Sequence, residues 1–143
     1  MNAAGQLYAN ELELGAVLPV VLRHASRVQL FLYSAATWNP HRIHYDVDYA
    51  RFEGHPDVIV HGPLQGAWLS QYVTEWAGPA GRMRSLQWQN RASALPEQDY
   101  EFHGRVTAIE GEFVTLEVWE QDRAGMVLMP GVAVVQLPLR SEG

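Results

Sequence analysis

Residues 34–46 read Ser34-Ala-Ala-Thr-Trp-Asn-Pro-His-Arg-Ile-His-Tyr-Asp46, and this stretch says more about the fold than any other part of the chain. Asn39-Pro40 favours a turn, because proline fixes its own φ and keeps the preceding residue out of the helical region. Imidazoles held on such a turn, those of His41 and His44, can exchange protons near neutral pH. A surface loop that is merely rich in histidine is the alternative interpretation, since loops collect polar residues.

A long helix is predicted shortly after this stretch, at about residues 62–77. Its apolar side chains recur at steps of three and four residues and occupy most of the circumference; they are Leu64, Ala67, Trp68, Leu69, Tyr72, Val73 and Trp76. Pro63 suits a first helical turn, and Gly78-Pro79 ends the helix. We therefore expect a buried helix at the centre of the fold, with its aromatic residues in the core or at a dimer surface.

The residues before this helix are less decisive. Residues 16–24 are rich in β-branched side chains and interrupted by Pro19, which suits a strand at the edge of a sheet. Residues 26–36 fit either a short helix capped by Ser26 or a strand, because the spacing of their apolar residues satisfies both. A further short helix is expected at residues 46–52.

Everything after the long helix reads as sheet. Strands are expected where apolar and polar residues alternate, at 84–92, 99–109, 113–120 and 126–137. Turns are expected at 110–112 and 122–125, and Pro130-Gly131 suggests a bulge or kink in the last strand. The predicted fold class is α+β, with a curved antiparallel sheet wrapped around one central helix.

Composition narrows the classes of protein that fit. With 143 residues, 48% of them hydrophobic and 18% charged, the chain is expected to form a single domain over residues 1–143 with a sizeable core. A net charge of −6 argues against nucleic acid or a membrane as a partner. The sequence has no cysteine, no signal-peptide pattern at its N-terminus and no apolar run of about 18 residues, so we expect a cytoplasmic protein.

The motifs resemble those of the MaoC-like enoyl-CoA hydratases and 3-hydroxyacyl-thioester dehydratases. The chain carries Asn39-Pro40, then His44-Tyr-Asp-Val-Asp-Tyr-Ala50, and Val60-His-Gly62 directly before the long helix. Residues 72–79 are similar to a segment of actinobacterial members, including small subunits of steroid side-chain hydratases. The resemblance covers about residues 15–138 and implies the hotdog fold.

Two departures from the usual pattern affect the expected chemistry. Three residues separate Pro40 from His44, where the usual pattern has one, and Thr37 stands where an aspartate is usual. The string is more similar to the branch of mitochondrial-type hydroxyacyl-thioester dehydratases and mesaconyl-CoA hydratases. That branch usually carries an additional N-terminal half, which a second hotdog subunit could supply.

Hydration of a 2-enoyl thioester needs a base for water, an acid for C2 and stabilisation of the thioester oxygen. The resemblance implies that His44 is the acid and base, because it is in register with the His-x-Asp motif; a histidine that only holds the turn in place is the alternative. Gly62 is the oxyanion candidate, since its N–H lies at a helix start and glycine allows close approach; it could also be a simple helix-start glycine. Asn39 either orients the water or holds the loop.

The remaining candidates are residues expected to line the substrate site. Thr37 cannot act as a base at neutral pH, which leaves a one-histidine mechanism or an inactive site. Asp46 could orient His44, although capping of the following helix is the stronger expectation. His41 is either a second proton carrier or a solvated loop residue, and His61 either lines the tunnel or stabilises the turn.

The leading hypothesis is hydration of a 2-enoyl-CoA to the (3R)-3-hydroxyacyl-CoA, or the reverse dehydration. We expect no redox cofactor and no metal, because the thioester of CoA or an acyl carrier protein activates the alkene and no suitable ligand spacing surrounds the histidines. The second hypothesis is a non-catalytic or half-catalytic subunit that pairs with another hotdog chain. A hotdog thioesterase ranks last, because Glu75 alone supplies a carboxylate on the long helix and lies at its far end. We expect a homodimer or a heteromer.

Overall fold

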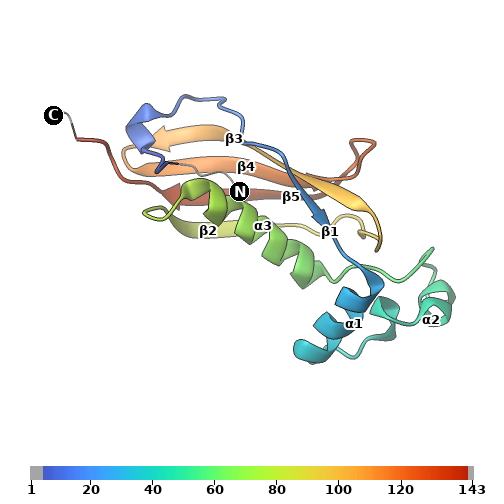
Figure 1. Ribbon diagram of the computed structural model, residues 1–143. Coiled ribbons are helices and arrows are strands. Elements are labelled where there is room, and N and C mark those ends of the chain that lie inside the picture. The colour runs from blue at the N-terminus through green and yellow to red at the C-terminus, as the bar shows by residue number, and fades with distance from the viewer. Residues whose placement is uncertain (1–4, 142–143) are drawn as a thin grey trace.

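The computed structural model describes residues 5–141 and contains one curved sheet with a long helix against it (Figure 1). The strands are β1 (Val21–His24), β2 (Arg82–Trp88), β3 (Asp99–Glu110), β4 (Phe113–Gln121) and β5 (Val127–Gln136). The helices are α1 (Arg27–Ala36), α2 (Val47–Phe52) and α3 (Gly62–Ala77), with short 3₁₀ helices η1 (Ala9–Glu11) and η2 (Arg42–His44). The α+β class is confirmed.

The five strands are antiparallel and lie in the order β1-β3-β4-β5-β2. Alternation along β4 explains the core, since Val114, Leu116 and Val118 are fully buried on one face. β1 lies at one edge, as predicted, and β2 lies at the other. Each edge strand pairs with a single neighbouring strand in the described part of the chain.

Helix α3 lies along the concave face of the sheet (Figure 1). Its predicted span is confirmed, and Trp68 and Tyr72 are core residues whose rings approach Phe102 at centroid distances of 6.3 and 6.1 Å. The expectation of burial around most of the circumference was wrong, because Ala67 and Gln71 are exposed on the opposite side. Apolar residue types alone do not reveal that only one face of the helix has sheet against it.

Two ambiguous segments are now resolved. Residues 26–36 form a helix, since the Ser26 side chain accepts a hydrogen bond from the Gln29 backbone N–H at the start of α1.

The expected bulge at Pro130-Gly131 was wrong, because both residues stay in continuous register with β4. Gly131 is needed for a different reason, since a Cβ there would lie 2.8 Å from the carbonyl oxygen of Gln87.

Helices α1 and α2 lie beyond the end of the sheet, beside the N-terminal end of α3 (Figure 1). This arrangement brings the Asn-Pro turn and η2 close to the first turn of the central helix. No helix among residues 5–141 is long and apolar enough to cross a membrane.

Candidate active site

Two imidazoles meet where η2 approaches the start of α3. The rings of His44 and His61 are stacked, with centroids 3.8 Å apart and planes inclined by 18°. His44 is 7% exposed and His61 is fully buried. Two histidines that are 17 positions apart in sequence therefore form one buried pair. The spacing of the motifs does not by itself show that the two rings are in contact.

The tautomer of His44 follows from its hydrogen bond. Its Nδ1 lies 2.7 Å from the carbonyl oxygen of Ile59, so Nδ1 carries the proton and donates it, and Nε2 keeps a lone pair. Burial lowers the pKa of His44 from 6.5, and nearby His41 and His55 lower it further, although the bond to Ile59 acts in the opposite direction. His44 is therefore a neutral imidazole near pH 7, with the chemistry of a base.

His61 is held differently. Its Nε2 lies 2.8 Å from the hydroxyl oxygen of Ser34, and its ring lies 4.6 Å from that of Tyr33. Its Nδ1 has no hydrogen-bond partner within residues 5–141. Burial, and then the charge that His44 can carry, lower the pKa of His61 to about 4. His61 stays neutral at physiological pH, so protonation of the stacked pair falls on His44.

Ser34 was missed by the sequence reasoning. It lies four residues after Leu30, and both side chains are buried on the inner face of α1. A polar residue on the buried face of an amphipathic helix was the available signal. Its partner His61 is 27 residues away in sequence.

Gly62 is the first residue of α3, and no side chain caps this end of the helix. The first N–H groups of a helix lack intrahelical partners and carry the positive end of its dipole. A Cβ at Gly62 would lie 2.7 Å from Nδ2 of Asn90, so this side-chain amide sits directly beside the helix start. The arrangement suits an oxygen that is gaining negative charge.

The Asn-Pro turn is held by its own side chains. Thr37 ends α1, and its hydroxyl donates to the carbonyl oxygen of Tyr33 at 2.6 Å. Asn39 Oδ1 accepts a hydrogen bond of 3.3 Å from the His41 backbone N–H. The half-exposed His41 ring lies 6.1 Å from that of His44 and 3.5 Å (N to O) from a carboxylate oxygen of Glu53.

Asp46 acts as the N-cap of α2, as expected. One carboxylate oxygen accepts the Tyr49 backbone N–H at 3.1 Å, and the other lies 2.6 Å from Nη2 of Arg42. The bond to Arg42 holds the pKa of Asp46 below its usual value. The alternative role, orientation of His44, finds no support, because the orienting contact of His44 is the carbonyl of Ile59.

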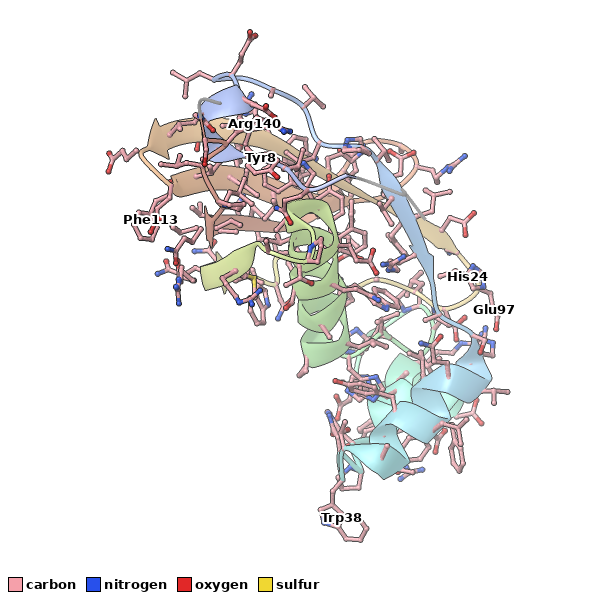
Figure 2. The ribbon with its side chains drawn as sticks, turned by 60° about the vertical axis from the view of Figure 1, so that its left-hand side comes forward. Tyr8, His24, Trp38, Glu97, Phe113 and Arg140 are labelled. Carbon is pink, nitrogen blue, oxygen red and sulfur yellow. The ribbon has the colours of Figure 1, made fainter. Side chains whose placement is uncertain are left out.

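A cleft of about 210 Å³ opens between the end of α1 and the Asn-Pro turn, and neither His44 nor His61 lines it. Its lining residues are Phe31, Ser34, Ala35, Trp38, Asn39, Pro40 and Tyr45. Ser34 connects this cleft to His61. Trp38 at the rim is 90% exposed and projects away from the molecule (Figure 2). A larger depression of about 400 Å³ lies elsewhere, at Gln98 and the β4–β5 turn, and none of its lining residues contacts His44 or His61.

A second buried polar pair lies under the first turn of α3. Nε2 of Gln65 donates to Oε2 of Glu120 at 2.6 Å, and both residues are buried. Burial raises the pKa of Glu120 to about 7, although the hydrogen bond from Gln65 lowers it. Neither residue was predicted, yet strand alternation already placed Glu120 on the same face as Val118.

The described residues contain no group of three or more histidine, aspartate or glutamate side chains arranged to bind a metal ion. The site consists of two stacked neutral imidazoles, an uncapped helix N-terminus and a small cleft. Such a set can move a proton and stabilise an oxyanion.

Comparison with known proteins agrees with this chemistry. The sequence model of the family described as "Hydroxyacyl-thioester dehydratase type 2" matches residues 19–96. The beta subunit of the 3-oxo-4,17-pregnadiene-20-carboxyl-CoA hydratase of Mycobacterium tuberculosis is 27% identical over 126 residues, covering 88% of this chain and 95% of that subunit.

Solved structures show the same fold. A chain of the ChsH1-ChsH2 complex from Mycobacterium tuberculosis superposes with a TM-score of 0.79 at 24% identity, covering 87% of this chain and 98% of that one. The R-hydratase PhaJ1 from Pseudomonas aeruginosa gives a TM-score of 0.84 at 21% identity, covering 94% and 88%. The expected hotdog fold is confirmed. Because the family model covers more than half of the chain, the protein belongs to the hydroxyacyl-thioester dehydratase type 2 family.

Proposed function

We propose that this protein hydrates 2-enoyl-CoA to (3R)-3-hydroxyacyl-CoA, or catalyses the reverse dehydration, with His44 as both base and acid. One observation carries the proposal: a buried, neutral His44, fixed through Nδ1 to Ile59, lies beside the uncapped start of α3. The names of the relatives, which are hydratases and dehydratases, support the reaction class, and the R-hydratase likeness supports the stereochemistry.

The reaction proceeds in two proton transfers. Nε2 of His44 removes a proton from water while the water oxygen bonds to C3 of the enoyl group. The electron pair of the double bond moves toward the thioester carbonyl, whose oxygen gains negative charge. The Gly62 N–H and the positive end of α3 stabilise that charge. The imidazolium of His44 then returns the proton to C2, so that one water has been added.

The other predicted site residues have supporting roles in this proposal. Asn39 orients the water or holds the turn that carries His41. His61 packs against His44 and, being neutral, leaves it as the group that titrates. Thr37, His41 and Asp46 shape the loop around the thioester. No step requires a metal or a cofactor beyond the thioester itself.

Replacement of His44 by alanine tests the proposal. The His44→Ala variant should lose about 10²–10⁴-fold in kcat for crotonyl-CoA, followed as loss of enoyl absorbance, while circular dichroism stays unchanged. His24→Ala is the control, because His24 ends edge strand β1 and its ring contacts Glu97 and Asp99. It lies at the start of α1, whereas Trp38 and the Asn-Pro turn follow the other end of that helix (Figure 2). A His44 variant that keeps most of its kcat would make His44 structural and the proposal wrong.

A second candidate is a subunit that completes the site of another hotdog chain. Thr37 favours it, because a hydroxyl that donates to Tyr33 replaces the acid usual in this motif. The matched relative is itself a beta subunit, and one structural relative lies in a two-protein complex. Addition of a homologous hotdog subunit to an inactive preparation tests this reading: hydration that appears only in the mixture supports it, and hydration by the chain alone refutes it.

A further inference from the structure

The reaction as proposed makes no use of the buried Glu120. This residue is fully buried on the inner face of β4, in line with Val114, Leu116 and Val118. Oε2 accepts from Gln65, whereas Oε1 has no hydrogen-bond partner among the described residues. A buried carboxyl oxygen without a hydrogen-bond partner destabilises the fold, so we expect a hydrogen-bonding group of a bound molecule to pair with it.

The position of the pair relates it to the proposed thioester site. Gln65 follows Gly62 by three residues, which places it about 4.5 Å further along the axis of α3 and on an adjacent part of the helix surface. The hydrogen bond from Gln65 to Glu120 joins the first turn of α3 to the inner face of β4, so a polar pair lies in the core next to the helix start.

We infer that Glu120 and Gln65 form a polar end of the acyl site, and that the preferred substrates carry a hydroxyl group beyond the double bond. The inference rests on the proposed function, because the thioester is placed at Gly62. A hydroxyl can both donate and accept, so it satisfies Oε1 whether the carboxyl is charged or neutral. A purely aliphatic chain leaves Oε1 unpaired.

Binding of saturated thioesters tests this without turnover. Hexanoyl-CoA and its ω-hydroxy analogue are titrated calorimetrically into the full chain. Wild type should bind the hydroxylated thioester about tenfold more tightly, because the hydroxyl adds a hydrogen bond and gives the unpaired Oε1 of Glu120 a partner. Glu120→Met, of similar size but apolar, should remove or reverse the preference.

The control is Glu117→Gln, which changes a carboxylate on the outer face of the same strand, where it pairs with Arg105. It should keep the wild-type preference. Equal affinities for the two thioesters in wild type, binding of neither, or a preference that survives in Glu120→Met would overturn the inference. If Glu120→Met does not fold, the ratio of the two thioester affinities in wild type still tests the inference.

The two proposals can fail separately. A hydroxyl preference in a chain that hydrates no enoyl-CoA would leave the polar acyl site standing and refute the catalytic proposal. Hydration of crotonyl-CoA without any preference for a hydroxyl group would support the catalytic proposal and refute the polar acyl site. A water molecule bound to Oε1 of Glu120 would then account for its unpaired state.

Discussion

The Glu120→Gln substitution should change how the stability of this protein depends on pH. In the fold, burial raises the pKa of Glu120 to about 7 from its ordinary value of 4.5. The folded state therefore favours the protonated carboxyl. Glu120 contributes stability that is fully present below about pH 4.5 and is lost as the pH rises through about 7.

The magnitude follows from the two pKa values. A gap from 4.5 to about 7 corresponds to about 3 kcal/mol in total, at about 1.4 kcal/mol for each pKa unit. Linkage places about 2–3 kcal/mol of this loss between pH 5 and pH 8. The glutamine variant cannot ionise and keeps a side chain of the same size, so this contribution disappears.

If only the wild type were measured, the titration of His61 would hide the pH dependence that Glu120 causes. Its pKa is lowered to about 4 in the fold, so its contribution is present above pH 6.5 and is lost as the pH falls through about 4. Between pH 8 and pH 5 that loss amounts to about 2 kcal/mol, which nearly offsets the gain from Glu120. The difference between wild type and variant cancels the histidine contribution and isolates Glu120.

The assay is urea unfolding at pH 5, 6, 7 and 8 with one protein concentration throughout. The free energy of unfolding of wild type, minus that of Glu120→Gln, should be about 2–3 kcal/mol larger at pH 5 than at pH 8. Glu117→Gln should give a nearly constant difference. A constant difference for Glu120→Gln as well would refute the reasoning, because Glu120 would then have the same pKa in the folded and unfolded chains.

Three other predictions concern the site and the assembly. Gly62→Ala should fold, because the exposed end of Asn90 can shift, yet lose at least about tenfold in kcat/KM for crotonyl-CoA. Gly66→Ala, whose Cβ would clash with the ring of Trp88, should instead lower the free energy of unfolding by about 1–3 kcal/mol. Thr37→Asp should change kcat while costing less than about 1 kcal/mol in urea unfolding, since Thr37 is exposed; an unchanged rate would favour the one-histidine mechanism. Ultracentrifugation at micromolar concentration should show at least a dimer, and a monomer near 16.1 kDa would contradict the expected pairing of hotdog subunits.

The sequence predicted the parts of the fold that local chemistry determines. The span of α3 follows from its apolar periodicity and from Gly78, and the strands follow from alternation. The cap at Ser26 decided between helix and strand, but the capping bond is visible only in the structure. The free face of α3 was not predictable from composition, because burial depends on which surface lies against the helix.

The candidate site was predicted in part, because its motif is local and its contacts are not. The motif placed His44 near the turn and Gly62 at a helix start, and both lie there. The Ser34–His61 bond and the Gln65–Glu120 pair join residues 27 and 55 positions apart, which no spacing argument reaches. An acidic residue such as Glu120 is usually exposed, so its inward register was overlooked.

The most direct test of the central claim is the pH dependence of kcat/KM for hydration of crotonyl-CoA by wild type. If neutral His44 is the base, activity should stay constant from pH 8 down to neutrality. It should then fall along a single acidic limb whose apparent pKa lies below 6.5, because burial lowers the pKa of His44. Activity that rises as the pH falls, or an acidic limb with its midpoint above pH 7, would contradict the assignment of His44 as the catalytic base.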